Sequence, residues 1–253
     1  MFAVERQKKI MELLESEGAV WVNKLSAELK VTEETVRRDL EKLEKQEMLL
    51  RTHGGAVPFA QSNNELSLEK RKKINTDIKV KLAKEAVKNI LSGDTIFLDA
   101  STTTFYIAKE IKDIKNITVV TNSLRVINEL AGKADINVIG IGGTVSGNQS
   151  FVGSLAQNEI RKCYFANKMF FSSRGVTAEA GILESNEQEC GVKQCMLKNS
   201  TKKYYLCDKS KIGRIGFTKL ADFSEIDSII CEGNLSKEFV DILTEEKVDI
   251  ISI

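Results

Sequence analysis

The hydrophobic positions among the first 57 residues recur at helical spacing in three consecutive segments. The first two segments cover residues 4–16 and 22–29, and the third begins after Thr32, a residue type that caps helix N-termini well. The apolar residues of the third segment stand at positions i, i+4 and i+7, and they are Val36, Leu40 and Leu43. That spacing places them on one helix face, so the pattern predicts three helices that share a small core.

The chain changes pattern after the third helix. Residues 49–52 and 56–57 flank His53-Gly54-Gly55, which predicts two short strands joined by a glycine turn. Two helices joined by a tight turn and followed by a hairpin are the parts of a winged helix-turn-helix. In that fold the second helix of the pair enters the major groove of DNA, so the first unit is predicted to bind DNA.

In the rest of the chain, strand-like and helix-like segments alternate. Strands are predicted at 95–99, 117–121, 136–140, 168–171, 203–207, 228–231 and 249–251, and helices at 103–111, 123–131, 186–198 and 237–243. Strands that alternate with helices form a mostly parallel sheet with helices on both faces. The predicted fold class is therefore α/β, with an N-terminal winged helix-turn-helix followed by a Rossmann-like, mostly parallel domain.

The boundary between these units is marked by the single proline of the chain, Pro58. Polar and charged residues fill positions 59–73, which is typical of a linker. We therefore expect a DNA-binding domain over residues 1–57, a linker over 58–73 and an α/β domain over 74–253.

Composition narrows the class of protein further. Of the 253 residues, 42% are hydrophobic and 29% are charged, which is typical of a soluble globular chain. Glu5 and Arg6 interrupt any apolar leader after Met1, so no signal peptide is expected. The longest uncharged stretch, residues 136–158, is broken by polar residues and glycines, so no membrane span is expected. Five cysteines without a CxxC pair and a single histidine argue against disulfides, a zinc site and a histidine-dependent triad. We expect a cytoplasmic protein without a metal or another cofactor.

The predicted third helix carries cations on the face opposite its apolar residues. The residues of that face, at spacings of 3, 4 and 3, are Thr35, Arg38, Lys42 and Lys45. Hydroxyl and cationic side chains in this arrangement suit phosphate oxygens and base acceptors. Arg37 lies beside them, and the wing adds two further candidates. The residues expected to contact double-stranded DNA are Thr32, Thr35, Arg37, Arg38, Lys42, Arg51 and His53.

The charge of the first unit is unfavourable for a monomeric DNA reader. Residues 1–57 hold 10 Lys and Arg against 11 Asp and Glu, a net charge of −1. Affinity for DNA requires several contacts between cations and phosphates. Because several DNA-binding domains joined in one assembly make more of these contacts, we expect a homo-oligomer, either a dimer or a tetramer. A small helical domain with an ordinary solvated charged face is the alternative interpretation.

Polar residues follow three consecutive strands of the predicted α/β domain. The runs 99–104, 121–123 and 140–143 each stand at the carboxyl end of a strand, where open α/β sheets bind ligands. The first run, Asp99 to Thr104, also opens a helix, and its hydroxyls suit a phosphate. Asp208 to Lys211 brings a carboxylate and two ammonium groups to the same edge. Helix capping and surface charge are the alternatives for these runs.

A dinucleotide site is not expected at this edge. Val145 stands where the third glycine of a GxGxxG motif beginning at Gly140 would be required. Glu189 and Lys193 stand four residues apart on a predicted helix and are interpreted as a surface pair.

Several of these runs carry a resemblance to a known family. In the first unit they are Val31-Thr32-Glu33-Glu34-Thr35-Val36-Arg37-Arg38-Asp39-Leu40, then Leu43, then Arg51-Thr52-His53-Gly54-Gly55-Ala56. In the second they are Phe97-Leu98-Asp99 with Thr102-Thr103, Val120-Thr121-Asn122-Ser123, Gly142-Gly143, Gly153 and Asp208-Lys209-Ser210-Lys211. Together they resemble the DeoR family of transcriptional regulators over essentially the whole chain.

The resemblance implies that residues 74–253 sense an effector on a fold similar to sugar-phosphate isomerases. The implied effector is a phosphorylated sugar, and the implied function is repression of a sugar-metabolism operon under its control. The residues implied to line the effector pocket are Asp99, Ser101, Thr102, Thr103, Asn122, Ser123, Gly142, Gly143 and Lys211.

Two other functions stay open. An enzyme similar to sugar-phosphate isomerases would use Asp99, Glu189 and Lys211 as acid–base groups, although it would have no use for the first 57 residues. A DNA-binding regulator with a non-functional pocket is the second. It is suggested by Ser101, which replaces a glycine common in the family, and by the bulky cation Arg174.

Overall fold

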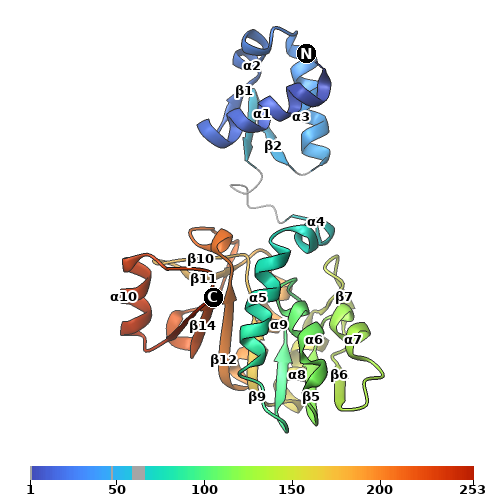
Figure 1. The fold of residues 1–253 in the computed structure, drawn as a ribbon. Helices are drawn as coiled ribbons and strands as arrows, with labels where there is room; N and C mark the ends of the chain where they lie inside the picture. Colours follow the sequence, from blue (N-terminus) through green and yellow to red (C-terminus); the bar gives the residue numbers. More distant parts are fainter. Residues whose placement is uncertain (1, 47, 59–65) are drawn as a thin grey trace. The chain divides into compact units, whose positions relative to one another are not determined.

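The computed structural model describes residues 2–46, 48–58 and 66–253. The chain divides into two compact units, Met1–Leu66 and Ser67–Ile253, and each is described by itself (Figure 1). None of the helices over the described residues combines the length and the apolar character that crossing a bilayer requires.

The first unit packs helices against a three-stranded antiparallel sheet (Figure 1). Its elements are α1 (Ala3–Glu17), β1 (Val20–Trp21), α2 (Val22–Leu29), α3 (Glu33–Lys45), β2 (Leu49–Thr52) and β3 (Gly55–Pro58). β2 and β3 form the predicted hairpin, and β1, which the pattern did not predict, pairs with β3. The predicted winged helix-turn-helix is confirmed.

The apolar face of α3 is buried, as its spacing predicts. Val36, Leu40 and Leu43 are each 2% exposed or less, and each contributes about 1.5–3 kcal/mol by its burial. Arg6 of α1 and Asp39 of α3 form a buried ion pair beside this core. α3 is therefore fixed to α1 by a charge pair as well as by apolar packing.

The second unit is built on a seven-stranded sheet with the order β15-β14-β12-β9-β4-β5-β6. Every neighbouring pair in it is parallel. The strands are β4 (Thr95–Leu98), β5 (Ile117–Thr121), β6 (Ile136–Gly140), β9 (Ala166–Phe171), β12 (Ser200–Cys207), β14 (Ser228–Cys231) and β15 (Asp249–Ser252). The predicted parallel α/β domain is confirmed.

Helices cover both faces of this sheet. They are α5 (Thr76–Val87), α6 (Thr104–Glu110) and α7 (Leu124–Leu130) on one face, and α8 (Ser154–Cys163), α9 (Glu187–Lys198) and α10 (Lys237–Glu245) on the other. Successive strand residues point to opposite faces. Ile96 and Leu98 therefore pack against the first group of helices and Phe97 against the second, each of the three fully buried.

The structure also contains elements that the pattern did not predict, among them α5 and α8. An antiparallel sheet is made of β10 (Gly175–Thr177), β11 (Gly181–Glu184) and β13 (Thr218–Ala221), and a hairpin of β7 (Thr144–Val145) and β8 (Phe151–Val152). Short 3₁₀ helices lie at Ile111–Asp113, Lys209–Lys211 and Phe223–Glu225.

The stretch expected as a linker, residues 58–73, contains the helix α4 (Leu68–Lys73). Residues 59–65 of that stretch lie outside the described part of the chain. Arg71 of α4 donates a hydrogen bond to Asn148 Oδ1 at 2.5 Å. Lys79 of α5 donates to the backbone carbonyls of Arg71 at 2.5 Å and Ile74 at 2.7 Å. α4 is thus held to the second unit by both its side chains and its backbone.

Candidate functional site

The helix α3 begins at a side-chain cap. The Thr32 hydroxyl accepts a hydrogen bond from the Thr35 backbone N–H at 3.3 Å, and the two hydroxyl oxygens are 2.9 Å apart. Glu33 and Glu34 occupy the first turn, where their charge favours the helix dipole. Both threonines are thus engaged at the helix start, with Thr32 exposed and Thr35 half-buried.

The predicted cations lie on the exposed side of α3 and on the wing, and most of them are paired with glutamates. The ion pairs are Arg37–Glu33 at 3.3 Å, Arg38–Glu34 at 3.2 Å, Lys45–Glu41 at 2.8 Å and Arg51–Glu44 at 2.8 Å. Exposed pairs of this kind contribute about 0.2–1 kcal/mol each. Replacing the glutamates by DNA phosphates therefore costs little. Lys42 is exposed and has no ion-pair partner among the described residues.

A cavity of about 360 Å³ opens between α3 and the wing. Its lining brings together Arg37, Arg51 and His53, which are predicted DNA contacts, and the Glu44 carboxylate. A phosphate in this cavity would meet two guanidinium groups and would displace Glu44 from Arg51. The remaining predicted contacts lie along α3 and at its cap.

The second candidate site lies where the order of strands in the sheet reverses. From β4 the chain adds β5 and β6 on one side, and β9, β12, β14 and β15 on the other. Such a switch point opens a crevice at the carboxyl ends of the two central strands. Here Asp99 follows β4 and Ser172 follows β9, and the Ser172 N–H donates to Asp99 Oδ2 at 3.2 Å.

Asp99 is fully buried in a cluster of charges. The Lys193 ammonium lies 3.0 Å from Asp99 Oδ2 and 2.5 Å from Glu184 Oε2, and it donates to the Ser172 carbonyl at 2.8 Å. Burial by itself would raise the pKa of Asp99, but the Lys193 ammonium and a hydrogen bond from Thr104 outweigh it and hold this pKa below its ordinary value. Both oxygens of Asp99 are thus occupied by groups of the protein.

The loop after β4 is built from hydroxyl residues that satisfy one another. The Ser101 N–H donates to Asp99 Oδ1 at 3.0 Å, and Ser101 Oγ accepts from the Thr104 N–H at 3.1 Å. Ser101 is thus hydrogen-bonded to Thr104, the first residue of α6, whose N-cap position is held by Thr103. Thr102 and Thr103, the other predicted site residues of this loop, are 6% and 0% exposed.

Lys211 reaches the same edge from the 3₁₀ helix after β12. Its ammonium donates to Thr103 Oγ1 at 3.4 Å and to Ser172 Oγ, and it lies 3.7 Å from Asp208 Oδ2. Burial would raise the pKa of Asp208, but Lys211 and its hydrogen-bond donors, Asn75 among them, hold this pKa below its ordinary value. The structure thus brings together Lys211 and Thr103, two of the predicted site residues.

The strand β5 ends in two buried polar residues. The Asn122 amide donates to the Phe151 carbonyl at 3.0 Å, and Ser123 Oγ accepts from the Val126 N–H at 3.4 Å and caps α7. Asn122 Oδ1 is buried and has no hydrogen-bond partner among the described residues. An unpaired buried acceptor costs about 1–3 kcal/mol. Asn122 is thus a predicted site residue with unused hydrogen-bonding capacity.

Gly142 and Gly143 have partners that explain them by packing. The Gly142 N–H donates to Glu159 Oε2 at 3.1 Å. Gly143 has a φ of +146°, and a Cβ there would lie 2.7 Å from the Val152 carbonyl oxygen. Gly143 thus lets the turn after β6 approach β8 and α8, whereas a Cβ on Gly142 would meet only an ordinary contact at 3.8 Å.

The interpretation of Glu189 and Lys193 as a surface pair is wrong. The two residues are 5% and 6% exposed, because their side of α9 faces the sheet. Glu189 Oε1 accepts hydrogen bonds from Ser146 Oγ at 2.9 Å and from Ser150 Oγ at 2.5 Å, whereas Lys193 pairs with other carboxylates. Arg174 is also buried, at 7% exposure.

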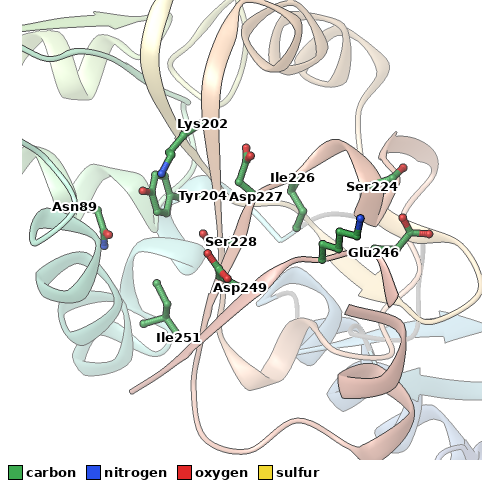
Figure 2. A pocket seen from close by; sticks show the side chains of 11 residues that line it. Asn89, Lys202, Tyr204, Ser224, Ile226, Asp227, Ser228, Glu246, Asp249 and Ile251 are labelled. Carbon is green, nitrogen blue, oxygen red and sulfur yellow. The ribbon is translucent and has the colours of Figure 1, made fainter. Parts of the chain in front are cut away.

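A larger cavity, of about 480 Å³, lies at the opposite edge of the sheet (Figure 2). It is lined by residues near the amino ends of β12, β14 and β15, among them Lys202, Asp227 and Asp249. Open α/β sheets bind ligands at the carboxyl ends of their strands. This cavity is therefore separate from the predicted effector site.

Comparison with known proteins covers both units. The family described as the DeoR-like helix-turn-helix domain matches residues 6–62, and that described as the DeoR C terminal sensor domain matches residues 74–233. The uncharacterized HTH-type transcriptional regulator YulB of Bacillus subtilis is 39% identical over 254 residues, which cover 100% of this chain and 98% of that one.

Other relatives are named for sugar operons. The L-fucose operon activator of Haemophilus influenzae is 34% identical, covering 91% of this chain and 92% of that one. The lactose phosphotransferase system repressor of Staphylococcus epidermidis is 33% identical over 97% and 96%. Ribose 5-phosphate isomerase A of Methanocaldococcus jannaschii is 18% identical with a TM-score of 0.41 over 55% of each chain, too distant to bear on function. The chain therefore belongs to the DeoR family of DNA-binding transcriptional regulators and is not an isomerase-like enzyme.

Proposed function

We propose that this chain represses a sugar-metabolism operon in the cytoplasm. Residues 1–57 bind the operator, and residues 74–253 bind a phosphorylated sugar that releases it. The proposal depends on the exposed cations of α3, which lie beside the wing. The apolar face of α3 is buried in the first unit, so its cationic face is the one available to DNA. The relatives named for the lactose and L-fucose operons support the sugar class of the effector.

The DNA contacts follow from the geometry of α3. Arg38 and Lys42 extend from the exposed side of the helix toward base edges and phosphates in the major groove. Arg37 and the wing contact the DNA backbone. The proposed contacts are Thr32, Thr35, Arg37, Arg38, Lys42, Arg51 and His53.

The effector is proposed to lie at the switch point between β4 and β9. Lys211 and the hydroxyl of Thr103 approach one end of it, and the free acceptor of Asn122 receives a sugar hydroxyl. Asp99 and Ser101 hold the loop in shape. The proposed set is Asp99, Ser101, Thr102, Thr103, Asn122, Ser123, Gly142, Gly143 and Lys211.

Regulation requires that the effector favour one arrangement of the protein over another. A coupling of about 1–3 kcal/mol would change operator affinity about 5- to 150-fold. We place the transmitter in residues 58–73, between the two domains, and we expect a dimer or tetramer because the charge of one DNA-binding domain is unfavourable. Exchange of this stretch for a Gly/Ser linker should abolish the effector response and preserve DNA binding. An unchanged response would show that the coupling runs elsewhere.

Footprinting of genomic DNA with the purified chain tests the proposal. We expect a protected sequence whose occupancy falls when one member of a panel of pentose and hexose phosphates is added, and not when the unphosphorylated sugar is added. Absence of any protected sequence under all conditions would overturn the proposal. Protection that no phosphosugar changes would support the non-functional pocket instead.

A further inference from the structure

We infer that Arg125 is the anion anchor of the effector site and binds the phosphate or carboxylate group of a sugar derivative. The inference rests on the proposed function, which places the effector at the carboxyl edge of the sheet. Arg125 stands in the first turn of α7, three residues after Asn122. No motif in the sequence marks it.

Two lysines of this edge, Lys193 and Lys211, are already paired with carboxylates. Lys193 is shared by the carboxylates of Asp99 and Glu184, at 3.0 and 2.5 Å. Lys211 faces the carboxylate of Asp208 at 3.7 Å and donates to neighbouring hydroxyls. An arriving anion would therefore compete with carboxylates of the protein at both lysines.

Arg125 is differently placed. Its Nη1 is buried and has no hydrogen-bond partner among the described residues. Its Cζ lies 3.9 Å from the centroid of the Phe105 ring. Contact with the ring face holds the guanidinium in place without using its N–H groups, which suit the oxygens of a phosphate or carboxylate. A buried cationic donor without an acceptor is the feature that an anionic ligand would complete.

The second unpaired group on the same turn is Asn122 Oδ1, an acceptor in a residue that is 1% exposed. One turn of chain thus presents a free cationic donor and a free neutral acceptor. A ligand with an anionic group and hydroxyls offers a partner to each of them, and sugar phosphates and sugar acids contain both groups.

One cation of α4, Arg71, lies close enough to Arg125 to repel its charge. Burial lowers the pKa of Arg125. The positive charge of Arg71 lowers it further, whereas Tyr106 and Glu69 raise it. Glu69 itself is bound by Lys72 at 2.5 Å. An anion at Arg125 would relieve the repulsion between two guanidinium groups, one on α7 and one on α4, which lies within the proposed transmitter.

Calorimetric titration of the full chain tests the assignment, with sugar phosphates and sugar acids as separate arms because a guanidinium binds both. The variants are Arg125→Ala and Arg125→Lys. The matched control is Lys109→Ala, which removes a second cation from the same ring, since Lys109 Nζ lies 5.1 Å from the Phe105 centroid. Operator binding without effector shows that each variant is folded.

We expect Arg125→Ala to weaken the binding of the responding compound at least about tenfold, the loss typical of one charge-assisted hydrogen bond. Arg125→Lys should recover part of the affinity, and Lys109→Ala should change it less than about twofold. Equal affinity of Arg125→Ala and the parent chain would overturn the assignment and leave the proposed function standing. If the parent binds no compound of either arm but still protects its operator, the proposed effector sensing is wrong and the assignment is wrong with it.

Discussion

Asp99 at the end of β4 and Lys193 in the middle of α9 form a buried ion pair, with 3.0 Å between Oδ2 and Nζ. Glu184, at the end of β11, lies 2.5 Å from the same ammonium. One lysine is thus shared by two carboxylates from different elements. It joins the residues that follow β4 and β9, since it also donates to the Ser172 carbonyl.

This cluster predicts unequal effects of two substitutions. Lys193→Met leaves two buried carboxylates without a cation, and we expect it to destabilise the second unit by about 3–5 kcal/mol. Asp99→Asn should destabilise it less, because Glu184 still pairs with the ammonium. Urea unfolding followed by circular dichroism measures both. The control Lys198→Met, at an exposed position of α9, should have little effect, and a Lys193→Met curve that matches it would contradict the prediction.

Lys79 predicts an alkaline gain in stability. Burial and then the Lys211 ammonium lower the pKa of Lys79 to about 8, against an ordinary value of 10.5. Between these values the unfolded chain binds more protons at this group, so stability rises with pH by up to about 1.4 kcal/mol per pH unit. The free energy of unfolding of the parent should therefore increase relative to that of Lys79→Met between pH 8 and 10. Lys81→Met, exposed on the same helix, is the control, and a constant difference for Lys79→Met would refute the expectation.

Arg38 predicts the size of one DNA contact. Its side chain is 74% exposed and is paired only with Glu34 among the described residues. If the guanidinium contacts a base, Arg38→Ala should weaken operator binding by about 1–3 kcal/mol. If it contacts phosphate, the substitution should weaken binding to operator and to scrambled duplex alike. Mobility-shift titration against operator and scrambled duplex separates the two cases. Lys162→Ala removes an equal charge from the second unit and should leave affinity unchanged. Equal operator affinity of Arg38→Ala and the parent chain would show that Arg38 does not contact the operator.

Trp21, the single tryptophan of the chain, predicts an optical signal for wing contact. Its side chain is 51% exposed and lies beside the wing, since a Cβ on Gly54 would stand 3.8 Å from the indole. Operator DNA at the wing would change the surroundings of this indole, so its emission should shift and reach a plateau when the operator is fully bound. Scrambled duplex at high salt is the control. Constant emission during demonstrable operator binding would show that the wing stays off the DNA.

The sequence predicts those elements whose environment is set by neighbouring residues. α3 is such a case, because Thr32 caps it and its apolar residues recur at helical spacing. α5 is the opposite case. Lys79 stands on its buried face with Leu82 and Ala86, and the charge interrupts the apolar pattern. The backbone carbonyls that accept hydrogen bonds from Lys79 lie in and just after α4, which a periodicity argument does not see.

The candidate site shows the same division. Polar runs at strand ends are visible in the sequence, because parallel strands place their carboxyl ends at one edge. Lys193 could not be found in this way, since its spacing from Glu189 suits an exposed pair equally well. Arg125 depends on the Phe105 ring of another helix, and a contact of that kind follows only from the packing of α6 against α7.

The strand order has a consequence for how the protein is made. Because β4 has β9 as a neighbour, a nascent subunit that has emerged only as far as β8 possesses the hydroxyl loop but lacks Ser172, Lys193 and Lys211. Under the proposed function, recognition of the effector is thus acquired late in synthesis, when the two halves of the sheet join. A fragment truncated before β9 would keep the DNA-binding domain. Under the proposed function it would not respond to the effector, even among full-length copies that do respond.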